Sequence, residues 1–437
     1  MYIEKVCKKY YYIHGKNHIQ NTNISILFKI QTMDKKRISI LLIICLANAL
    51  IYTLPYLQST YYDSMMAAYG YSHVQMGNII SVYGVCNTMA YLFGGVAADA
   101  IDTKKLFVFS LASTGIAGIF SATLPPYPVM LVISVFWSVS TILTFWPAML
   151  KAVKNLAEGA HQGQVFAFKE TMCCIIAFVF SMAALAVFRF TGENFVLLVM
   201  FYSVCHLIVA VLVAVFMPSM PAEGNPDVKS LISGVAKVIH LKGVWLIGMT
   251  IFFAQMFAVI MGRFTPFLTS VGGLSASTVA LITIVSVNGL ANIGSMSGGR
   301  ISDMYHSPAR FISFAMIAGA VLTGVFLYLP WSQETAIVCV GISVLFRILH
   351  ASFKSVLFAT MSQVDIPREL TGTASGVISI IGYMPDVFGY TLCGAVMQSF
   401  DTVPAYRIIF TGLIVICLAG SFTANMLHNY SVKIKKA

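Results

Sequence analysis

The chain has 437 residues, of which 58% are hydrophobic and only 10% are charged. Soluble globular proteins carry about a quarter of their residues as charged side chains, so the composition disfavours a soluble enzyme. Twelve membrane helices of about 21 residues would occupy about 250 residues, which matches the hydrophobic share of the chain and also disfavours a single-anchor receptor. A net charge of +11 can indicate nucleic-acid binding, but the positions of the basic residues argue against it.

Apolar runs of membrane-spanning length predict an all-α membrane protein with twelve transmembrane helices. The runs form two groups of six, so we expect two pseudo-symmetric six-helix bundles over residues 38–217 and 243–428. A polar linker, 218–242, joins them, and the tails 1–37 and 429–437 flank them. The expected spans lie near residues 38–61, 74–98, 106–124, 128–150, 165–188, 195–217, 243–268, 277–299, 311–330, 335–358, 373–397 and 408–428.

Lysine and arginine residues are concentrated in the tails, in the linker and in alternate loops. These segments hold 21 of the 27 basic residues, whereas the intervening loops hold only Arg189 and Arg407. Because cytoplasmic loops carry the excess of Lys and Arg, we expect both termini to be cytoplasmic. Membrane topology accounts for the net charge, so we expect these residues to face a lipid bilayer and not nucleic acid.

The sequence allows a prediction for the start of the N-terminal tail and another for the structure of the linker. Residues 1–32 lack the apolar core of a signal peptide, and Met33 directly precedes Asp-Lys-Lys-Arg and the first span. The native protein is therefore expected to begin either at residue 1 or at Met33. In the linker, apolar residues from Val228 to Ile239 follow helical spacing, which predicts an amphipathic helix on the membrane surface. A linker with a single helical turn is the alternative.

Eight of the nine cysteines fall inside the expected spans, and only Cys7 does not. Cys173 and Cys174 are adjacent, and no cysteines stand at the spacing of a metal-ligand set. We therefore expect the cysteines to be small packing residues, with no disulfide framework, no metal and no cofactor.

The two halves of the chain resemble each other at matching positions. Both carry Gly-x-x-x-Asp at the end of a span followed by basic residues, at Gly95, Asp99, Lys104 and Lys105 and again at Gly299, Asp303 and Arg310. A serine precedes each aspartate by a similar distance, 27 residues for Ser72 and 28 for Ser275. This order of features predicts two copies of one structural unit.

The doubled motif and the six-plus-six spans resemble the major facilitator superfamily, whose loop between spans two and three has the form Gly-x-x-x-Asp-x-x-x-(Arg/Lys)-(Arg/Lys). The resemblance covers residues 38–428. It implies alternating access, in which two bundles rock about a site near the bilayer midplane. Glycine lets two helices approach closely, and the resemblance implies that Asp99 and Asp303 latch the bundles in one state. Ala100 stands where the family has arginine, which predicts a weaker first latch.

Charged residues inside spans are the first candidates for a binding site, because a mid-bilayer charge costs about 2.5–3.5 kcal/mol on insertion scales. Arg347 lies about 18 Å from the outer edge of span ten, and His350 and Lys354 share its helix face. We expect Arg347 to bind an anionic group of the substrate, because guanidinium pairs bidentately with carboxylate or phosphate. An internal salt bridge is the alternative. His350 is expected at the substrate either as a proton shuttle or as a packed neutral histidine, and Lys354 is expected to snorkel toward the inner edge of the span.

Asp386, which follows a proline in span eleven, is the first candidate for proton or cation coupling. Pairing with Arg263 or Arg347 is the alternative role for this carboxylate. Arg263 lies in the outer part of span seven, where we expect it to guard the entrance and contact the substrate. Glu170 is the second candidate for ion coupling, unless it forms a self-contained pair with Lys169.

Neutral polar and aromatic residues of the cavity-lining spans complete the expected substrate site. Asn288 and Asn292 are spaced i, i+4 on span eight, and Trp146 stands beside Pro147, which suits a sugar ring or a flat organic anion next to a kink. The expected set is Tyr52, Trp146, Gln255, Asn288 and Asn292. Packing alone is the alternative for each of them.

Stretches in several spans are similar to a bacterial permease branch of the superfamily, grouped near sugar-acid and organic-anion symporters. They include Phe145–Ala152, Phe166–Glu170 and Thr371–Thr373. The branch has Glu-Gly-Gly-Arg-Gly in span five, where this chain reads Glu170-Thr-Met-Cys-Cys. The resemblance implies an importer of a small organic solute, and the basic residues inside the spans favour an anionic one. We expect a monomeric, multi-pass protein of the bacterial inner membrane that is driven by a proton or cation gradient.

Other functions fit the sequence less well. A proton-coupled drug exporter of the same superfamily usually has a Gly- and Pro-rich signature in span five, and residues 172–188 contain neither residue. A non-transporting receptor on the same fold would typically add a signalling domain, and an enzyme would need a convergent nucleophile, base or metal set. The chain has no Gly-x-x-x-x-Gly-Lys-(Ser/Thr) loop, so we do not expect ATP as the energy source.

Overall fold

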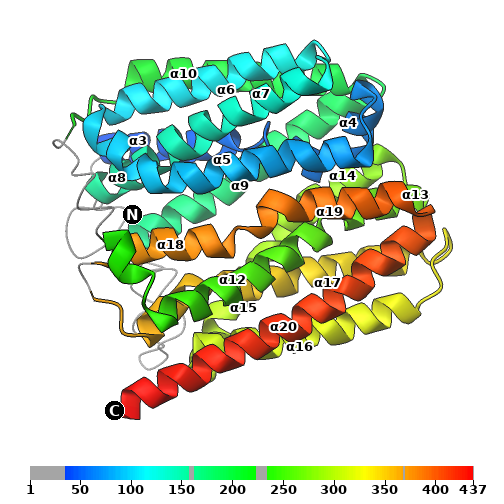
Figure 1. Cartoon of the computed structure of the whole chain (residues 1–437). Coiled ribbons are helices and arrows are strands. Elements are labelled where there is room, and N and C mark those ends of the chain that lie inside the picture. The colour runs from blue at the N-terminus through cyan, green and yellow to red at the C-terminus, as the bar shows by residue number, and fades with distance from the viewer. Residues whose placement is uncertain (1–34, 157–161, 223–233, 368–369, 437) are drawn as a thin grey trace, which may run out of the picture.

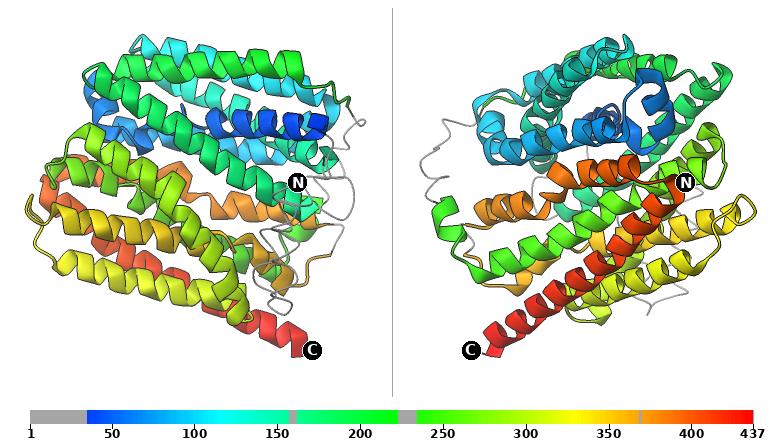
Figure 2. Two further views of the ribbon diagram at one scale, coloured as in Figure 1. Left: turned by 180° about the vertical axis from the view of Figure 1, so that it is seen from behind. Right: turned by 45° about the vertical axis from the view of Figure 1, so that its right-hand side comes forward.

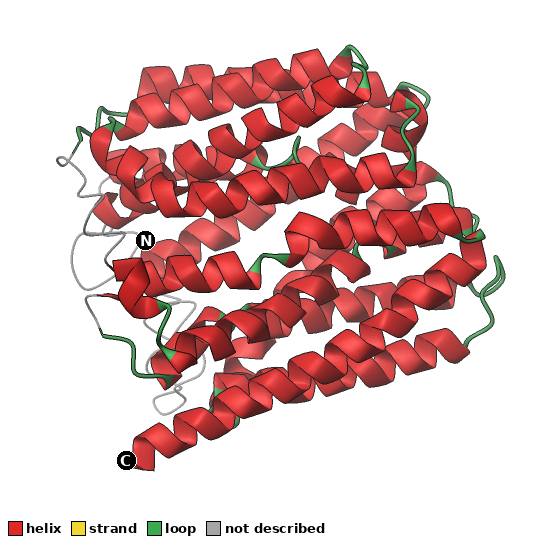
Figure 3. Ribbon diagram, in the orientation of Figure 1, coloured by secondary structure: helices red, strands yellow, loops and turns green. Residues whose placement is uncertain are grey.

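The structure is a computed structural model that describes residues 35–156, 162–222, 234–367 and 370–436. Within these residues the chain consists of helices joined by short connections, and no strand occurs among them (Figure 3). The predicted all-α architecture is therefore confirmed. The expected tail 1–32 and residues 223–233 of the expected amphipathic helix lie outside the described residues, whereas 234–238 are helical.

The first bundle contains the helices up to residue 216 (Figure 1). Helix α6 packs on α10, and α3 packs on α9. The buried apolar residues of these helices form one core. The elements are α3 (Lys35–Ile51), the 3-10 turn η1 (Leu57–Ser59), α4 (Tyr62–Tyr69), α5 (His73–Ala100), α6 (Thr103–Ala122), α7 (Tyr127–Ser138), the π-helical η2 (Val139–Phe145), α8 (Trp146–Leu156), α9 (Gln162–Phe190) and α10 (Phe195–Phe216).

The second bundle contains the helices from residue 242 onward and has a separate core. Helix α16 packs on α20, and α15 packs on α17. The elements are α12 (Lys242–Met261), α13 (Phe264–Ser270), α14 (Ala276–Ile284), the π-helical η3 (Val285–Leu290), α15 (Ala291–Met304), α16 (Pro308–Tyr328), α17 (Ala336–Lys354), the 3-10 helix η4 (Phe358–Gln363), α18 (Thr371–Gly382), α19 (Pro385–Ser399) and α20 (Thr402–Lys436).

Ten helical stretches among the described residues are long and apolar enough to cross a membrane, and they match the third to twelfth expected spans. The first two expected spans correspond to α3, which has 17 residues, and α5, which has 28. Helix α3 ends at Ile51 and not near residue 61. Pro55 explains the early end, because its ring has no N–H to donate to the carbonyl four residues earlier.

Several spans contain an interruption or a local change of helix type. The π-helical turns η2 and η3 lie in the fourth and eighth spans, one in each bundle. In the eleventh span, α18 ends at Gly382 and Pro385 begins α19, an interruption that the missing N–H of proline predicts. Such irregular turns often occur at functional sites, because they free backbone groups and redirect side chains.

Matching serines begin matching helices in the two bundles. Ser72 Oγ accepts a hydrogen bond from the N–H of Gln75 at 3.3 Å at the start of α5. Ser275 Oγ accepts one from the N–H of Thr278, also at 3.3 Å, at the start of α14. Each serine satisfies an N–H that the first helical turn leaves unpaired. The repeat seen in the sequence thus corresponds to equivalent helix starts.

The two bundles lie side by side, and the long helices of both run between the same two ends of the molecule (Figures 1 and 2). Helix α3 begins and α20 ends at one of these ends, which we call the terminal end. Helices α4 and α13 lie at the opposite end, which we call the distal end.

Hydrogen bonds between the bundles, taken over the described residues, lie in the middle and toward the distal end. At the distal end, Thr269 Oγ1 donates to a carboxylate oxygen of Asp63 at 2.5 Å. Helices α5 and α19 pack closely, since a Cβ on Gly84 would lie only 2.8 Å from the carbonyl oxygen of Asp386. The distal end is therefore where the bundles are closed on each other.

Candidate functional site

A cavity of about 510 Å³ lies between the two bundles. The first bundle contributes α3, the turn after it, α9 and α10, and the second contributes α14, η3 and α17. The lining residues are Asn48, Ala49, Tyr52, Thr53, Tyr56, Leu57, Ser59, Thr60, Tyr61, Cys173, Cys174, Ala177, Ser181, Tyr202, Thr283, Ile284, Val287, Asn288, Arg347 and Lys354.

The charged residues of this lining are two cations, and both come from α17. Arg347 and Lys354 are seven residues apart, so about two helical turns separate them on one face. His350 lies between them in sequence but is buried. Its ring stacks at 5.9 Å on that of Phe257 and meets that of Phe353 at 5.3 Å. Arg347 and Lys354 thus face the cavity, whereas His350 is packed among aromatic rings.

Asp386 is bound by a glutamine. Gln255 Nε2 on α12 donates to Asp386 Oδ1 at 2.9 Å and to Oδ2 at 3.1 Å. Asp386 lies in the first turn of α19, where the partial positive charge of the helix N-terminus favours a carboxylate. Among the described residues, the ion pairs within 4.0 Å do not include this carboxylate, so it is not paired with Arg263 or Arg347 in this structure.

Arg263 lies at the distal contact between the bundles and outside the cavity lining. Its guanidinium lies 5.2 Å from the ring centre of Tyr62 on α4 and 5.5 Å from that of Tyr390 on α19. The side chain is buried, and its Nε and Nη1 have no hydrogen-bond partner within the described part of the chain. Cation–π contacts to both bundles therefore hold Arg263 in place.

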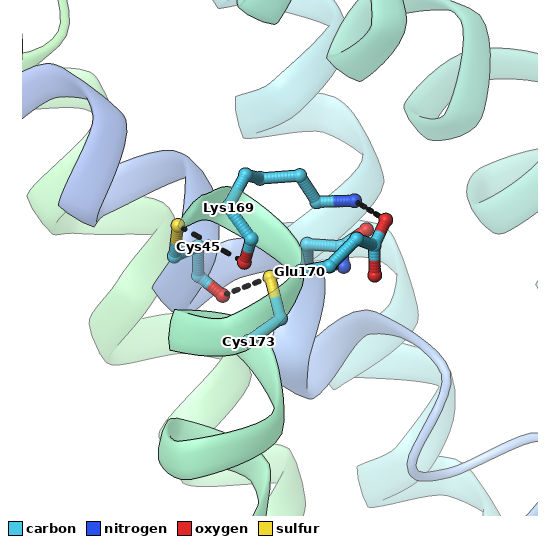
Figure 4. Close-up of polar contacts among 5 residues, drawn as sticks. Cys45, Lys169, Glu170 and Cys173 are labelled. Carbon is cyan, nitrogen blue, oxygen red and sulfur yellow. Dashed lines mark hydrogen bonds and ion pairs between the residues drawn. The ribbon is translucent and has the colours of Figure 1, made fainter. Parts of the chain in front are cut away.

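Glu170 is paired with its neighbour on α9 (Figure 4). Lys169 Nζ donates to Glu170 Oε1 at 2.6 Å. The lysine side chain is 2% exposed, whereas the glutamate side chain is 64% exposed. The self-contained pair expected as the alternative role of Glu170 is thus present, and it neutralises a lysine that is buried inside a span.

The two asparagines of the eighth span differ in their surroundings. Asn288 lines the cavity, and its Nδ2 donates to Ser181 Oγ across the bundles at 3.4 Å. Asn292 Nδ2 donates to the carbonyl of Asn288 at 2.8 Å, and its Oδ1 accepts from the Cys174 thiol at 3.4 Å. Trp146 is half-buried at the start of α8 and does not belong to the cavity lining.

Tyrosines form much of the cavity wall in the first bundle. Tyr52 lines the cavity, together with Tyr61 and Tyr202, which were not among the residues expected from the sequence. The cluster of tyrosines over residues 52–62 was an available signal for Tyr61. Tyr202 stands in an apolar span among other aromatic residues, and only the packing of α10 beside α9 identifies it.

The first Gly-x-x-x-Asp motif makes contacts within its own bundle. Asp99 Oδ1 lies 3.9 Å from Lys151 Nζ, so Asp99 does not join the bundles in this state. Asp102 instead caps α6, accepting from the N–H of Lys105 at 3.1 Å and from Ser219 Oγ at 2.6 Å. Partial burial alone would raise the pKa of the Asp102 carboxyl, but these hydrogen bonds outweigh it and the pKa lies below its usual value.

The close helix approach expected at the motif glycines occurs one residue earlier. A Cβ on Gly298 would overlap the backbone of Ser352 on α17, lying 2.7 Å from its Cα and its carbonyl carbon. On α5, a Cβ on Gly94 would lie 3.2 Å from Pro147 Cγ. Nothing lies within 4 Å of a Cβ on Gly299. The expectation for Gly299 is therefore wrong, and the glycine that packs against α17 is the preceding residue, Gly298.

The other motif residues lie toward the terminal end, on α5, α6, α15 and α16, and they are Gly95, Lys104, Lys105, Asp303 and Arg310. Asp303 is exposed, and the guanidinium of Arg310 lies 5.8 Å from the ring centre of Phe314. Among the described residues, the ion pairs within 4.0 Å do not include Asp303 or Arg310. A latch between the bundles through these residues thus stays a prediction for another state.

Known membrane proteins resemble this chain in sequence and in fold. The chain is 28% identical over 408 residues to the inner membrane protein YihN of Escherichia coli strain K12, covering 90% of this chain and 96% of that protein. The fold is similar to the crystal structure of the nucleoside transporter NupG, with a TM-score of 0.71 and 11% identity over 90% of this chain and 99% of that one. It is also similar to a bacterial homologue of the human lysosomal transporter Spinster in an inward-facing, unoccupied conformation, with a TM-score of 0.68 and 14% identity over 91% and 96% of the two chains.

At these identities the two solved structures show the fold alone. The model of the Major Facilitator Superfamily, however, matches residues 40–390, which span most of both bundles. The chain therefore belongs to the major facilitator superfamily and is a membrane transporter of that family.

Proposed function

We propose that the chain carries a small anionic organic solute, such as a sugar acid, across the cytoplasmic membrane by alternating access. The observation that supports an anion is the charge of the cavity: its described lining contains Arg347 and Lys354 and no carboxylate. Two cations on the wall of a cavity between two protein bundles attract a negatively charged group more strongly than they would in bulk water. A volume of about 510 Å³ lies within the range of small-molecule sites.

Within this site Arg347 binds the carboxylate or phosphate of the solute, because a planar guanidinium forms two parallel hydrogen bonds with such groups. Lys354 adds a second positive charge about two helical turns away. Tyr52 and Asn288 line the same cavity and offer hydroxyl and amide groups to the polar remainder of the solute. Arg263 acts at the distal contact and holds that end closed through Tyr62 and Tyr390.

The structure corresponds to one side of the proposed transport cycle. The bundles are closed at the distal end by hydrogen bonds such as that from Thr269 to Asp63. Basic residues such as Lys104, Lys151 and Arg300 lie toward the terminal end, which supports a cytoplasmic location for that end. In the proposed cycle the cavity is loaded from or released to the cytoplasm in this state, and the distal contacts separate in the opposite state.

Asp386 is the proposed coupling residue. Its carboxylate accepts two hydrogen bonds from Gln255, and its backbone lies against Gly84 at the packing of α19 on α5. Uptake of a proton replaces one acceptor oxygen with a hydroxyl, so one of the two hydrogen bonds from Gln255 is lost. Because this change occurs where the bundles meet, protonation of Asp386 alters the contact that must open during transport.

The anion assignment is tested by thermal shift on purified protein. The panel comprises sugar acids, organic phosphates, simple carboxylates, neutral sugars and nucleosides, with wild type, Arg347→Ala and Arg300→Ala. A ligand at about 100 times its Kd stabilises the folded state by about 2.7 kcal/mol. We expect a shift with one class of anion that is lost in Arg347→Ala and kept in Arg300→Ala, which removes an exposed charge outside the cavity.

Two results would overturn parts of this proposal. Shifts with neutral sugars, nucleosides or lipophilic cations that survive in Arg347→Ala would refute the anion site and favour an exporter of other solutes. Coupling is tested separately in proteoliposomes with the identified solute. We expect Asp386→Asn to abolish accumulation driven by a pH gradient while exchange of internal for external solute continues, and accumulation at the wild-type level would refute the role of Asp386.

A further inference from the structure

Two cysteines from different helices lie close together beside the cavity, and one of them, Cys173, lines it (Figure 4). Cys45 is on α3 and Cys173 is on α9. The Cys173 thiol donates to the carbonyl oxygen of Cys45 at 3.6 Å, and the Cys45 thiol donates to the carbonyl oxygen of Lys169 at 3.7 Å. Each sulfur thus reaches the helix that carries the other.

The surroundings of the two sulfurs are unequal. Cys45 is fully buried, whereas Cys173 retains 5% exposure and belongs to the cavity lining. The Nδ2 group of Asn48, also a lining residue, donates a hydrogen bond to Cys173 Sγ at 3.3 Å. An N–H group directed at sulfur supports the thiolate, which is the form that oxidants attack. Cys173 is therefore the more accessible and the more reactive of the pair.

We propose that Cys45 and Cys173 form an oxidisable dithiol, a modification site that is independent of the transported solute. The oxidant is a peroxide small enough to enter the cavity. The Cys173 thiolate attacks one oxygen of hydrogen peroxide, the O–O bond breaks, and sulfenic acid and hydroxide form. The Cys45 sulfur then attacks the sulfenic sulfur, its proton passes to the departing hydroxyl, and water leaves. The product is a Cys45–Cys173 disulfide, and a thiol reductant reverses it.

The disulfide would change both packing and the cavity wall. It would join α3 covalently to α9, two helices that already pack on each other. It would also convert the Cys173 thiol, which accepts the hydrogen bond from Asn48 Nδ2, into a disulfide sulfur. Because Asn48 lies in the last turn of α3 and lines the cavity, oxidation changes a contact of a residue that faces the solute.

Cys174 provides a matched control. It is adjacent to Cys173 and also lines the cavity, but its thiol donates to Asn292 of the second bundle at 3.4 Å. A cavity that merely admits peroxide would oxidise Cys174, the less buried of the two, at least as readily as Cys173. The Cys173 thiol instead reaches the carbonyl oxygen of Cys45 on α3, so Cys173 and not Cys174 is expected to form the disulfide.

The test treats the full chain in detergent with dilute hydrogen peroxide, followed by denaturation, thiol counting and peptide mapping without reductant. We expect the nine thiols of the chain to fall to seven in the wild type and dithiothreitol to restore all nine. The mapped cross-link should join Cys45 to Cys173. Cys174→Ser should form the same cross-link, whereas Cys45→Ser should stop at a sulfenic acid on Cys173 that dimedone traps.

Three results would overturn the proposal. In the first, the wild-type protein keeps all its thiols under peroxide. In the second, the mapped cross-link involves Cys174. In the third, dimedone labels Cys173 of the Cys45→Ser protein no faster than it labels the buried Cys339. The wild-type measurement decides the matter even if a serine variant fails to fold, because the cross-linked peptide is read directly from the native sequence.

Discussion

Gly298 and Gly299, at the start of the second motif, have opposite surroundings. Replacing each with alanine should therefore shift the stability of the protein in opposite directions. On Gly298 a Cβ would lie 2.7 Å from both the Cα and the carbonyl carbon of Ser352. That separation is shorter than real Cβ contacts, so α15 must move away from α17 to admit the methyl group. On Gly299 a Cβ would meet nothing within 4 Å.

The sizes of the two effects follow from this difference. Overpacking of this kind costs about 1–3 kcal/mol, whereas replacing glycine by alanine inside a helix gains about 0.5–1 kcal/mol. Gly298→Ala should therefore lose about 1–2 kcal/mol of stability, and Gly299→Ala should gain up to about 1 kcal/mol. For a unit of about 180 residues, each kcal/mol corresponds to about 2–4 °C in Tm.

The assay is thermal unfolding of both variants and the wild type in the same detergent. We expect Gly298→Ala to melt several degrees below Gly299→Ala, with the wild type between them. A Gly298→Ala protein that melts at or above the wild type would refute the close approach of α15 to α17. Because α17 carries Arg347 and Lys354, the same displacement should also weaken binding of any ligand found in the cavity.

Three further outcomes follow from contacts elsewhere in the molecule. Gln255→Leu removes both hydrogen bonds to Asp386 and should lower Tm by the equivalent of about 1–3 kcal/mol; a drop of equal size in an Asp386→Asn background would show that the lost hydrogen bonds are not the cause. Gly84→Ala places a Cβ 2.8 Å from the Asp386 carbonyl oxygen and should raise the ratio of distal-open to distal-closed molecules about 5–150-fold. Spin-label distances across the distal end measure this ratio. Gly324→Ala, whose Cβ meets nothing within 4 Å, is the control that should leave it unchanged. The pKa of Asp102 is depressed in the folded state by the hydrogen bonds that its carboxylate accepts. The carboxylate therefore stabilises the fold above the ordinary aspartate pKa of about 3.9, and this stabilisation is lost as pH falls through the lower folded pKa. Asp102→Asn should lower Tm at pH 7 but not at pH 2–3, and a Tm difference from the wild type that is the same at both pH values would contradict the assignment.

Much of the architecture could be predicted from the sequence, because it depends on patterns within single helices. Apolar runs predicted the membrane spans. The doubled Gly-x-x-x-Asp pattern and the two serines predicted that the two halves of the chain share one structure. Pro385 marked the interruption of the eleventh span. Proline also caused the main error, since Pro55 ends α3 earlier than hydropathy predicts. An apolar run shows where a chain can lie in lipid, but not where its backbone stays helical.

The site was harder to predict, because it depends on which helices meet. Helical spacing placed Arg347, His350 and Lys354 on one face, yet His350 packs against Phe257 on α12 and does not reach the cavity. Pairing with an arginine was the alternative role for Asp386, and the residue that binds its carboxylate is Gln255, 131 residues away. Both outcomes follow from helix rotation within the bundle, which the sequence of one helix does not contain.

The central claim is that the cavity binds an anion through Arg347. Its most direct test is a calorimetric titration of the best-shifting anion and its neutral analogue, a carboxylate and the corresponding alcohol, into wild type and Arg347→Ala. We expect the wild type to bind the anion at least about tenfold more tightly than the alcohol, a difference of about 1.4 kcal/mol, and Arg347→Ala to bind both equally. Equal affinities in the wild type, or a preference that survives in Arg347→Ala, would contradict the account.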